Sequence, residues 1–367
     1  MNVKIQFGVW EAVALLVNMI SAKVFLGYTR VMAETAGPAG WIVSIYAAVL
    51  AIIGFILINK LYSRFEGKDI LDIAGLYLGN TGRIITGTII SIYLLVMASL
   101  LLRDFSENMK TIALTDSPIS FVSLFFMVGV ITAAYAGIEA IVRFHALVVP
   151  IVVAGGALLI LAVAPYFDME NLTPILGTGT EKIFGLGSLR ISMYAELILL
   201  FLIVPFIKTN KNLRVVGYTS ICISGVFLTV STIAVLASFP YPIALENFLP
   251  LYNLSRLIQY GRFFQRVEAI FFIIWAASAL LYLSTGFFFF LYTFQKTFKL
   301  EFYKPLIIPA AILTFNISLL PQSLVQAVSL LTSNFRKWLW TLTFGYVIIL
   351  LFVAGIIQRG KKPSTGR

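Results

Sequence analysis

The sequence predicts an all-α polytopic membrane protein of ten transmembrane helices, arranged as a five-plus-five inverted repeat. Of its 367 residues, 60% are hydrophobic and 12% are charged, whereas soluble domains average about 25% charged residues. A membrane barrel would show short alternating segments instead. Polar residues interrupt the first and sixth apolar segments, and such breaks persist only where they line a cavity or are buried in protein. Breaks five segments apart predict an inverted repeat with a ligand site at the broken helices 1 and 6.

Ten apolar segments are long enough to span a bilayer, which requires about 20 residues. They lie at 7–34, 40–62, 84–106, 119–137, 143–165, 186–207, 213–239, 266–295, 304–320 and 338–358. We expect residues 1–367 to form one integral membrane domain, with repeats at about 7–165 and 186–358. The basic, polar tail at 359–367 is expected to be disordered.

The connections between these segments differ in character. Glycines and a proline at 37–40 predict a tight turn into the second segment. Residues 66–80 alternate charged and apolar positions at helical spacing, which predicts a short helix on the membrane surface. The Gly-, Thr- and Pro-rich stretch 166–187 is expected to be a loop, and 239–261 to form short helices that cap one membrane face.

The distribution of basic residues orients the bundle. If both termini are cytoplasmic, the short inside connections carry clusters of three or four lysines and arginines, as the positive-inside rule requires. The net charge of +11 then reflects helix ends beside the lipid surface. We therefore expect the lipid bilayer as a partner and no nucleic acid.

Enzyme chemistry finds little support in this sequence. The single histidine, His145, and the single cysteine, Cys222, fall in different segments and cannot make a His-rich metal site. Two Gly-x-Gly runs lie in a predicted loop with no strand before them. We expect no catalytic residue, no metal and no cofactor. His145 is interpreted as a hydrogen-bonded packing residue, with a pH-sensing or proton-relay role as the alternative.

Several other charges are interpreted as structural. Two pairs are spaced four residues apart near predicted membrane edges, namely Arg30 with Glu34 and Glu139 with Arg143. Two clusters end the third segment and open the eighth. They consist of Arg103, Asp104 and Glu107, and of Gln265, Arg266 and Glu268. We expect these clusters to anchor helices or to meet partner subunits.

The break in the first segment supplies half of a predicted ligand site. Its residues are Asn18, Ser21, Ala22 and Lys23. A helix break leaves backbone N–H groups free and directs a half-helix dipole into the cavity. This arrangement favours an anionic group such as an amino-acid carboxylate.

The sixth and eighth segments supply the other half. Glu196 either accepts the ligand's amino group or pairs with Lys23, and a purely structural intramembrane pair is the plainer interpretation. Met193 and Tyr194 are expected to line the cavity, with Tyr194 as a hydrogen-bond donor. Two residues one helical turn apart, Ser278 and Tyr282, would complete the pocket, although small polar residues also serve helix packing.

Four stretches give the chain a specific resemblance to a known family. They are Ala36–Ile42, Tyr135–Glu139 with Arg143, Asn171–Gly177 with Gly179, and Gln265–Glu268 followed by Trp275. In their order and spacing these stretches resemble the B subunit of bacterial spore nutrient-germinant receptors. That spore germination permease family belongs to the amino acid–polyamine–organocation transporter superfamily.

The resemblance implies a leucine-transporter-type fold in the spore inner membrane. It also implies an A-type membrane subunit and a C-type lipoprotein subunit as partners, and a nutrient, commonly an amino acid, that is sensed rather than accumulated. Tyr93 and Met97 match cavity-facing positions of the family, although the residues alone indicate ordinary helix packing. Many relatives have a small, Gly-rich run where this chain has Ser21, Ala22 and Lys23, a departure that would change which ligand fits.

Three interpretations of Lys23 follow. Its ammonium stands where sodium sits in sodium-coupled relatives, or it pairs with a ligand carboxylate, or it snorkels toward the outer face on its apolar stem. Three functions follow as well: a receptor subunit, an amino-acid secondary transporter working by alternating access, and a scaffold with a vestigial site. Receptor and transporter share a fold, so the fold does not separate them.

Overall fold

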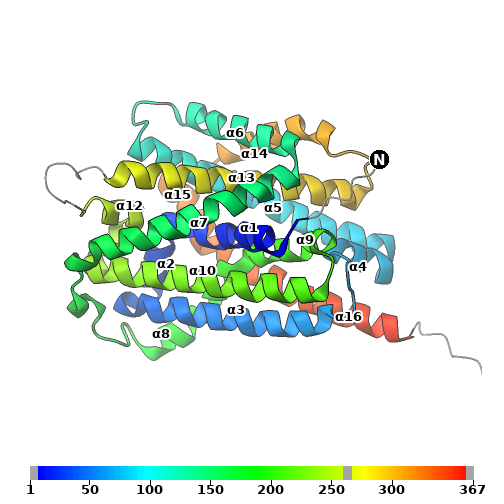
Figure 1. The fold of residues 1–367 in the computed structure, drawn as a ribbon, viewed down its shortest axis with the longest axis horizontal. Coiled ribbons are helices and arrows are strands. Elements are labelled where there is room, and N and C mark those ends of the chain that lie inside the picture. The colour runs from blue at the N-terminus through cyan, green and yellow to red at the C-terminus, as the bar shows by residue number, and fades with distance from the viewer. Residues whose placement is uncertain (1–6, 259–266, 361–367) are drawn as a thin grey trace, which may run out of the picture.

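The computed structural model describes residues 7–258 and 267–360, and within these ranges every regular element is a helix. Figure 1 shows the long helices lying roughly along one direction, with α1 near the middle. The expected tail at 361–367, and Gln265 and Arg266 at the start of the eighth segment, lie outside the described residues.

Eight of the described helical segments are long and apolar enough to cross a membrane. These segments contain α3 (Gly40–Tyr62), α5 (Gly79–Ile112), α6 (Ile119–Ala136), α7 (Ile138–Val163), α9 (Ile198–Ile207), α10 (Asn210–Ser238), α13 (Val267–Phe298) and α16 (Val347–Gly360), with α9 and α16 lengthened to Thr180–Ile207 and Arg336–Arg359 by the helical turns before them. The other two expected spans are not among these segments. One is the divided first segment, α1 (Val9–Ser21) with α2 (Tyr28–Ala36), and the other is α14 (Ile307–Ser318).

Both predicted breaks are present. In the first segment, α1 ends at Ser21, a 3₁₀ turn covers Ala22–Phe25, and α2 begins only at Tyr28. In the sixth, a 3₁₀ stretch (Leu186–Leu197) leads into α9, and Tyr194 within it leaves helical geometry at φ −109° and ψ 17°. The prediction of broken helices 1 and 6 is confirmed.

The segments that connect the spans agree broadly with the predictions from the sequence. The surface helix expected at 66–80 is α4 (Ile70–Tyr77). The loop expected at 166–187 contains one short helix, α8 (Thr180–Phe184), and the capping region contains α11 (Tyr241–Glu246) and α12 (Pro250–Ser255).

The last helix begins well before the last apolar span. We expected the span at 338–358, and the apolar span lies at Arg336–Arg359. Helical structure nevertheless runs without interruption from Leu324 to Gly360, through α15 (Leu324–Ser329), two π-helical stretches and α16. Ser323 caps the start of this helix by accepting a hydrogen bond from the Gln326 backbone N–H at 3.2 Å.

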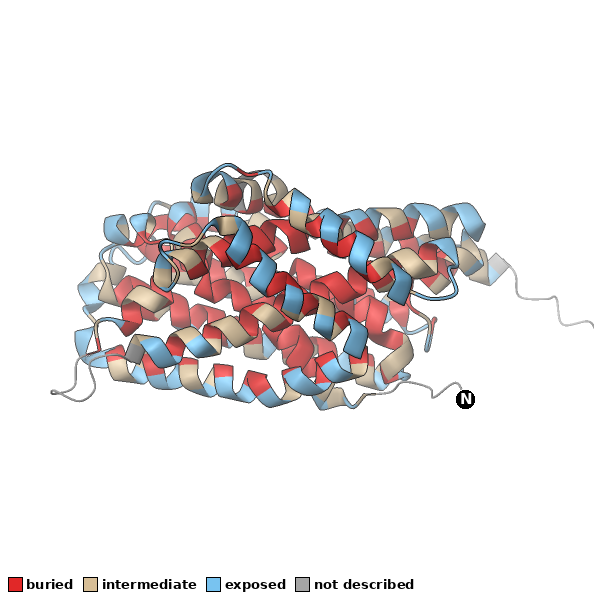
Figure 2. Ribbon diagram, turned by 90° about the horizontal axis from the view of Figure 1, so that it is seen from above, coloured by how far each residue is buried: buried red, intermediate tan, exposed pale blue. Residues whose placement is uncertain are grey.

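The broken first segment forms the centre of the bundle. Every residue from Ala12 to Leu26 is buried, and Figure 2 shows the buried residues concentrated inside and the exposed ones around the outside. Helix α1 contacts α7, α10 and the 3₁₀ stretch before α9. The break therefore faces protein on all sides, which is the condition under which irregular backbone is tolerated at membrane depth.

A second polar cluster connects α4 to the end of α13. Asp69 caps α4 by accepting hydrogen bonds from the Leu71 and Asp72 backbone N–H groups at 3.0 and 2.8 Å. Lys296 pairs with Asp69 at 2.5 Å and with Asp72 at 2.7 Å, and the Tyr292 hydroxyl donates to Asp69 at 3.0 Å. We name this set the α4–α13 latch.

Asp69 lies outside the spanning segments, and its titration gives a testable pH dependence. Burial raises the pKa of Asp69 from 3.8 to about 6, although the charge of Lys296 opposes the shift. Because the folded state holds this proton more tightly than the unfolded state, the contribution of Asp69 to stability is lost as the pH rises from about 4 through about 6. We expect wild type to lose stability relative to Asp69→Asn as the pH rises through this window. Thermal unfolding of both proteins from pH 4 to 7.5 measures it, and parallel curves would contradict it.

A close approach between α5 and α13 gives a second prediction. A Cβ built at Gly87 would lie 1.7 Å from the Thr297 hydroxyl and 2.7 Å from its Cβ, whereas one built at Gly345 meets nothing within 4 Å. We expect Gly87→Ala to lower the free energy of unfolding by about 1–3 kcal/mol through overpacking. The control Gly345→Ala should be neutral or slightly stabilising because alanine favours helix. Equal melting temperatures for the two variants would show that the helices are not in tight contact here.

Candidate functional site

The two breaks meet through one buried ion pair. Lys23 lies on the 3₁₀ turn of the first break, and its Nζ is 2.7 Å from Glu196 Oε2 in the sixth segment, where the side chains are 4% and 2% exposed. The same Nζ donates to the backbone carbonyl of Met193. The snorkelling interpretation of Lys23 is therefore wrong, and of the two alternatives for Glu196 the structure shows the pair.

Two further side chains bind the other oxygen of the same carboxylate. The Tyr282 hydroxyl on α13 donates to Glu196 Oε1 at 3.0 Å, and the guanidinium of Arg336 forms an ion pair with that oxygen. Glu196 thus holds together the two breaks, α13 and the start of the last span. We call Lys23, Glu196, Arg336 and Tyr282 the break cluster.

Arg336 is the site residue that sequence reasoning missed. It is 5% exposed and lies thirteen positions inside the last helical run, just after a π-helical stretch (Leu330–Phe335). The expected boundary at 338 placed it outside the membrane. A signal was present, because Ser323 is followed by an apolar helical pattern beginning at Leu324. Interpreting that cap as a helix start would have placed Arg336 inside the last helix.

The space around the break cluster is small. A cavity of about 30 Å³ is lined by Lys23, Gly27, Asp104, Met193 and Arg336, among others. Such a volume holds about one water molecule and is far below the roughly 300–1,000 Å³ of a typical ligand pocket. The charged side chains themselves fill the region between the breaks in this conformation.

Asn18 and Ser278 join α1 to α13 on the other side of the break. The Ser278 hydroxyl donates to Asn18 Oδ1 at 2.6 Å, and Asn18 Nδ2 donates to the Ser278 carbonyl at 3.1 Å. Ala22 is buried, and the buried Ser21 hydroxyl finds no hydrogen-bond partner among the described residues. The structure thus brings Asn18 and Ser278 together as one hydrogen-bonded pair.

Three expected pocket residues, Tyr93, Met97 and Tyr194, do not line the 30 Å³ cavity in this conformation. The Tyr194 hydroxyl faces α10, where a Cβ built at Gly225 would lie 3.3 Å from it. Tyr93 lines a groove with Phe335 and Trp338. Met97 is buried on α5 but does not line the 30 Å³ cavity, which α5 reaches with Leu101 and Asp104. That Tyr93, Met97 and Tyr194 line a ligand cavity stays a prediction.

The remaining charges behave as structural pairs. His145 is fully buried, with Nε2 2.8 Å from the Thr285 hydroxyl. The ion pairs predicted at four-residue spacing are present, Arg30 with Glu34 at 2.9 Å and Arg143 with Glu139 at 2.5 Å. Arg103 pairs with Glu107 at 2.7 Å. Among the described residues, no three His, Cys, Asp or Glu side chains gather as a metal site would require.

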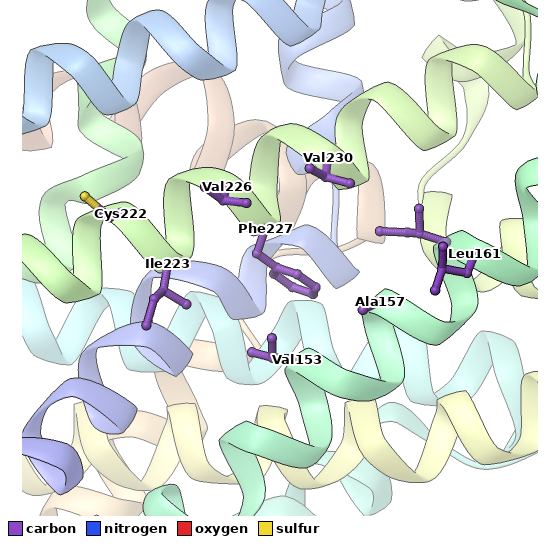
Figure 3. A pocket seen from close by; sticks show the side chains of 9 residues that line it. Val153, Ala157, Leu161, Cys222, Ile223, Val226, Phe227 and Val230 are labelled. Carbon is purple, nitrogen blue, oxygen red and sulfur yellow. The ribbon is translucent and has the colours of Figure 1, made fainter.

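A larger cavity of about 570 Å³ lies on the flank of the bundle, between α7 and α10 (Figure 3). Val153, Ala157 and Phe227 line it, and Cys222 supplies the most polar atom. Leu161 and Val226 on its rim are 69% and 65% exposed, as residues facing lipid would be. This groove lacks the polar groups that orient a small polar ligand, so the break cluster remains the candidate site.

Substitutions in the break cluster should lower the free energy of unfolding by unequal amounts. Glu196→Gln leaves two buried cations without their carboxylate, which should cost about 3–5 kcal/mol of unfolding free energy. Lys23→Met should cost clearly less, because Glu196 keeps Arg336 and Tyr282. The control Glu139→Gln removes an exposed pair and should change stability by less than about 1 kcal/mol. Thermal unfolding in detergent measures all three, and a Lys23→Met variant as unstable as Glu196→Gln would contradict this account.

Comparison with known proteins agrees with this architecture. A family model described as "Spore germination protein" matches residues 8–327. Spore germination protein KB of Bacillus subtilis (strain 168) is 24% identical over 64% of this chain and 64% of its own length. Spore germination protein A2 of the same organism is 23% identical over 97% of both chains.

A solved structure shares the fold. Mhp1, a nucleobase-cation-symport-1 family transporter in a closed conformation with bromovinylhydantoin bound, superposes with a TM-score of 0.72 at 12% identity, over 98% of this chain and 80% of that one. The chain is thus an integral membrane protein with the leucine-transporter-type fold, and it belongs to the spore germination protein family.

Proposed function

We propose that this protein is the membrane subunit of a spore germination receptor, that it senses a small nutrient, an amino acid, at the two helix breaks, and that it signals to partner subunits. The observation that carries the proposal is the break cluster. It places three charged side chains, all about 95% or more buried, where the irregular parts of two helices meet. Ionisable groups at membrane depth are costly and mark functional sites by default.

The break cluster connects four elements that a ligand would have to rearrange. Glu196 receives partners from the first break, from α13 and from the last span. A ligand that changes even one of these pairings favours a different arrangement of the helices. Such a ligand shifts the population only if it binds one arrangement more tightly than the other.

The proposed pocket is made of residues on both sides of the breaks. Asn18, Ser21, Ala22 and Lys23 form one wall, and Met193, Glu196, Ser278 and Tyr282 form the opposite one. Tyr194, Tyr93 and Met97 complete the proposed pocket, as the family resemblance implies for Tyr93 and Met97. We assign the protein no enzymatic role, in keeping with relatives that are germination proteins and a structural neighbour that is a transporter.

The proposal also names the partner subunits, the membrane and the orientation of the protein in it. The partners are an A-type membrane subunit and a C-type lipoprotein subunit, the membrane is the spore inner membrane, and both termini lie on the core side. The family membership supports this placement. Co-purification of the full chain with tagged A- and C-type subunits tests the partnership directly.

A second candidate function is secondary transport of an amino acid by alternating access. The observation that favours it is the likeness to a transporter over 98% of the chain. Reconstitution in liposomes separates the two functions, because a transporter exchanges internal unlabelled for external radiolabelled amino acid. A receptor binds the same amino acid without exchange.

Ligand-dependent stabilisation tests the proposal. A panel of amino acids, sugars and nucleosides is added to the purified full chain, and the melting temperature is measured for wild type, Lys23→Ala and the control Arg143→Ala, whose cation is exposed at the surface. A ligand at 100 times its dissociation constant stabilises the folded state by about 2.7 kcal/mol. We expect one amino acid to stabilise wild type and Arg143→Ala but not Lys23→Ala. If nothing stabilises wild type, either alone or with both partner subunits present, the protein is a scaffold.

A further inference from the structure

Within the break cluster two cations face one carboxylate, and the buried Asp104 at the same cavity forms no ion pair with either cation among the described residues. Two cations, Lys23 and Arg336, share the single carboxylate of Glu196, and both of its oxygens are already occupied. Arg336 carries five N–H donors, and its Nε is buried without a hydrogen-bond partner among the described residues. The cluster therefore has more donors than acceptors.

The spare donors border the same small cavity as a helix end. Lys23 and Arg336 line it, together with Gly27, Tyr28 and Val31 at the start of α2. Gly27 provides no side-chain cap for α2, so the first N–H groups of this nine-residue helix have no capping side chain. Cationic side chains, an unpartnered guanidinium N–H and a helix N-terminus all favour an anion.

We propose that Arg336 is a ligand-recognition residue and that the carboxylate of the ligand replaces Glu196 as the partner of its guanidinium. This inference rests on the proposed function and adds a specificity-determining residue to the pocket. In the present conformation Glu196 occupies the place that the ligand's carboxylate takes on binding. When the ligand's carboxylate displaces Glu196 from Arg336, both buried cations stay paired. A neutral group that displaced Glu196 would leave the charge of Arg336 uncompensated.

Asp104 completes the recognition. It is 4% exposed, lines the same cavity as the cations, and accepts a hydrogen bond from Asn108 at 3.1 Å. After the exchange Glu196 still accepts from Lys23 and Tyr282, whereas Asp104 accepts only from Asn108, so Asp104 has more room to accept from an ammonium group. The site thus fits a small molecule with a carboxylate at one end and a hydrogen-bond donor at the other.

The exchange of carboxylates would also change which helices are connected to each other. The Arg336–Glu196 pair is a direct polar link between the sixth segment and the last span. A carboxylate that takes over Arg336 breaks this link and frees the two elements to separate. Binding would then favour a more open arrangement, in which the pocket exceeds its present 30 Å³.

Chemical rescue tests the inference without knowledge of the nutrient. Glu196→Gln removes the internal carboxylate, and sodium acetate, with sodium chloride and acetamide at equal concentration as controls, is added to the purified full chain. We expect acetate to raise the melting temperature of Glu196→Gln by several degrees and to leave wild type nearly unchanged. The double variant Glu196→Gln/Arg336→Gln should lose the rescue, whereas Glu196→Gln/Arg103→Gln, which removes a buried arginine outside the cavity, should keep it. Equal effects of acetate and chloride would overturn the inference.

Ligand selectivity gives an independent readout. Once the panel identifies a stabilising amino acid, wild type should bind it about 100-fold or more tightly than its carboxamide. Arg336→Gln should reduce this ratio toward one, and Arg336→Lys, which keeps the charge but not the planar fork, should weaken binding and retain the preference. An unchanged ratio in Arg336→Gln, or no preference in wild type, refutes the role of Arg336 while leaving the sensor proposal intact. Absence of any ligand for wild type refutes the sensor proposal itself.

Discussion

The carboxylate of Glu196 is the constraint on which the centre of this protein depends. It accepts from Lys23, Tyr282 and Arg336, so one buried charge ties the first break, α13 and the last span to the sixth segment. A buried charge without partners costs several kcal/mol. The four elements are therefore held in register by an electrostatic requirement, in addition to the packing of their apolar faces.

The irregular backbone at the two breaks and the buried charges beside it stabilise each other. Where the sixth segment leaves helical geometry at Tyr194, backbone carbonyls lose their helical donors, and the Met193 carbonyl accepts from Lys23 instead. The lysine satisfies a backbone acceptor and a carboxylate together. Irregular backbone and a deep lysine would each be costly alone in a bilayer, and together they offset much of each other's cost.

The sequence was informative where a residue contrasts with its surroundings. Lys23 and Glu196 are conspicuous in apolar segments, and both breaks could be predicted from that contrast, whereas the pairing of Lys23 with Glu196 was one of several alternatives that the sequence left open. Arg336 could not, because it sits in a polar run that hydropathy assigns to a loop, although a π-helical stretch carries the helix through it. Met97 was expected in the cavity from the family resemblance, whereas the 30 Å³ cavity is reached from α5 by Leu101 and Asp104, a depth that helical spacing alone does not fix.

Helix α13 connects the break cluster to the α4–α13 latch. Tyr282 contacts Glu196, and Lys296 contacts Asp69 and Asp72, about 21 Å farther along the same helix at 1.5 Å per residue. A continuous helix moves as a rigid body, and each contact joins it to a different neighbour. Any rearrangement that shifts α13 at the pocket must also replace the partners of Lys296, because a half-buried cation cannot lose both carboxylates without cost. The polar contacts thus restrict the bundle to a few discrete arrangements, as a two-state receptor or an alternating-access transporter requires.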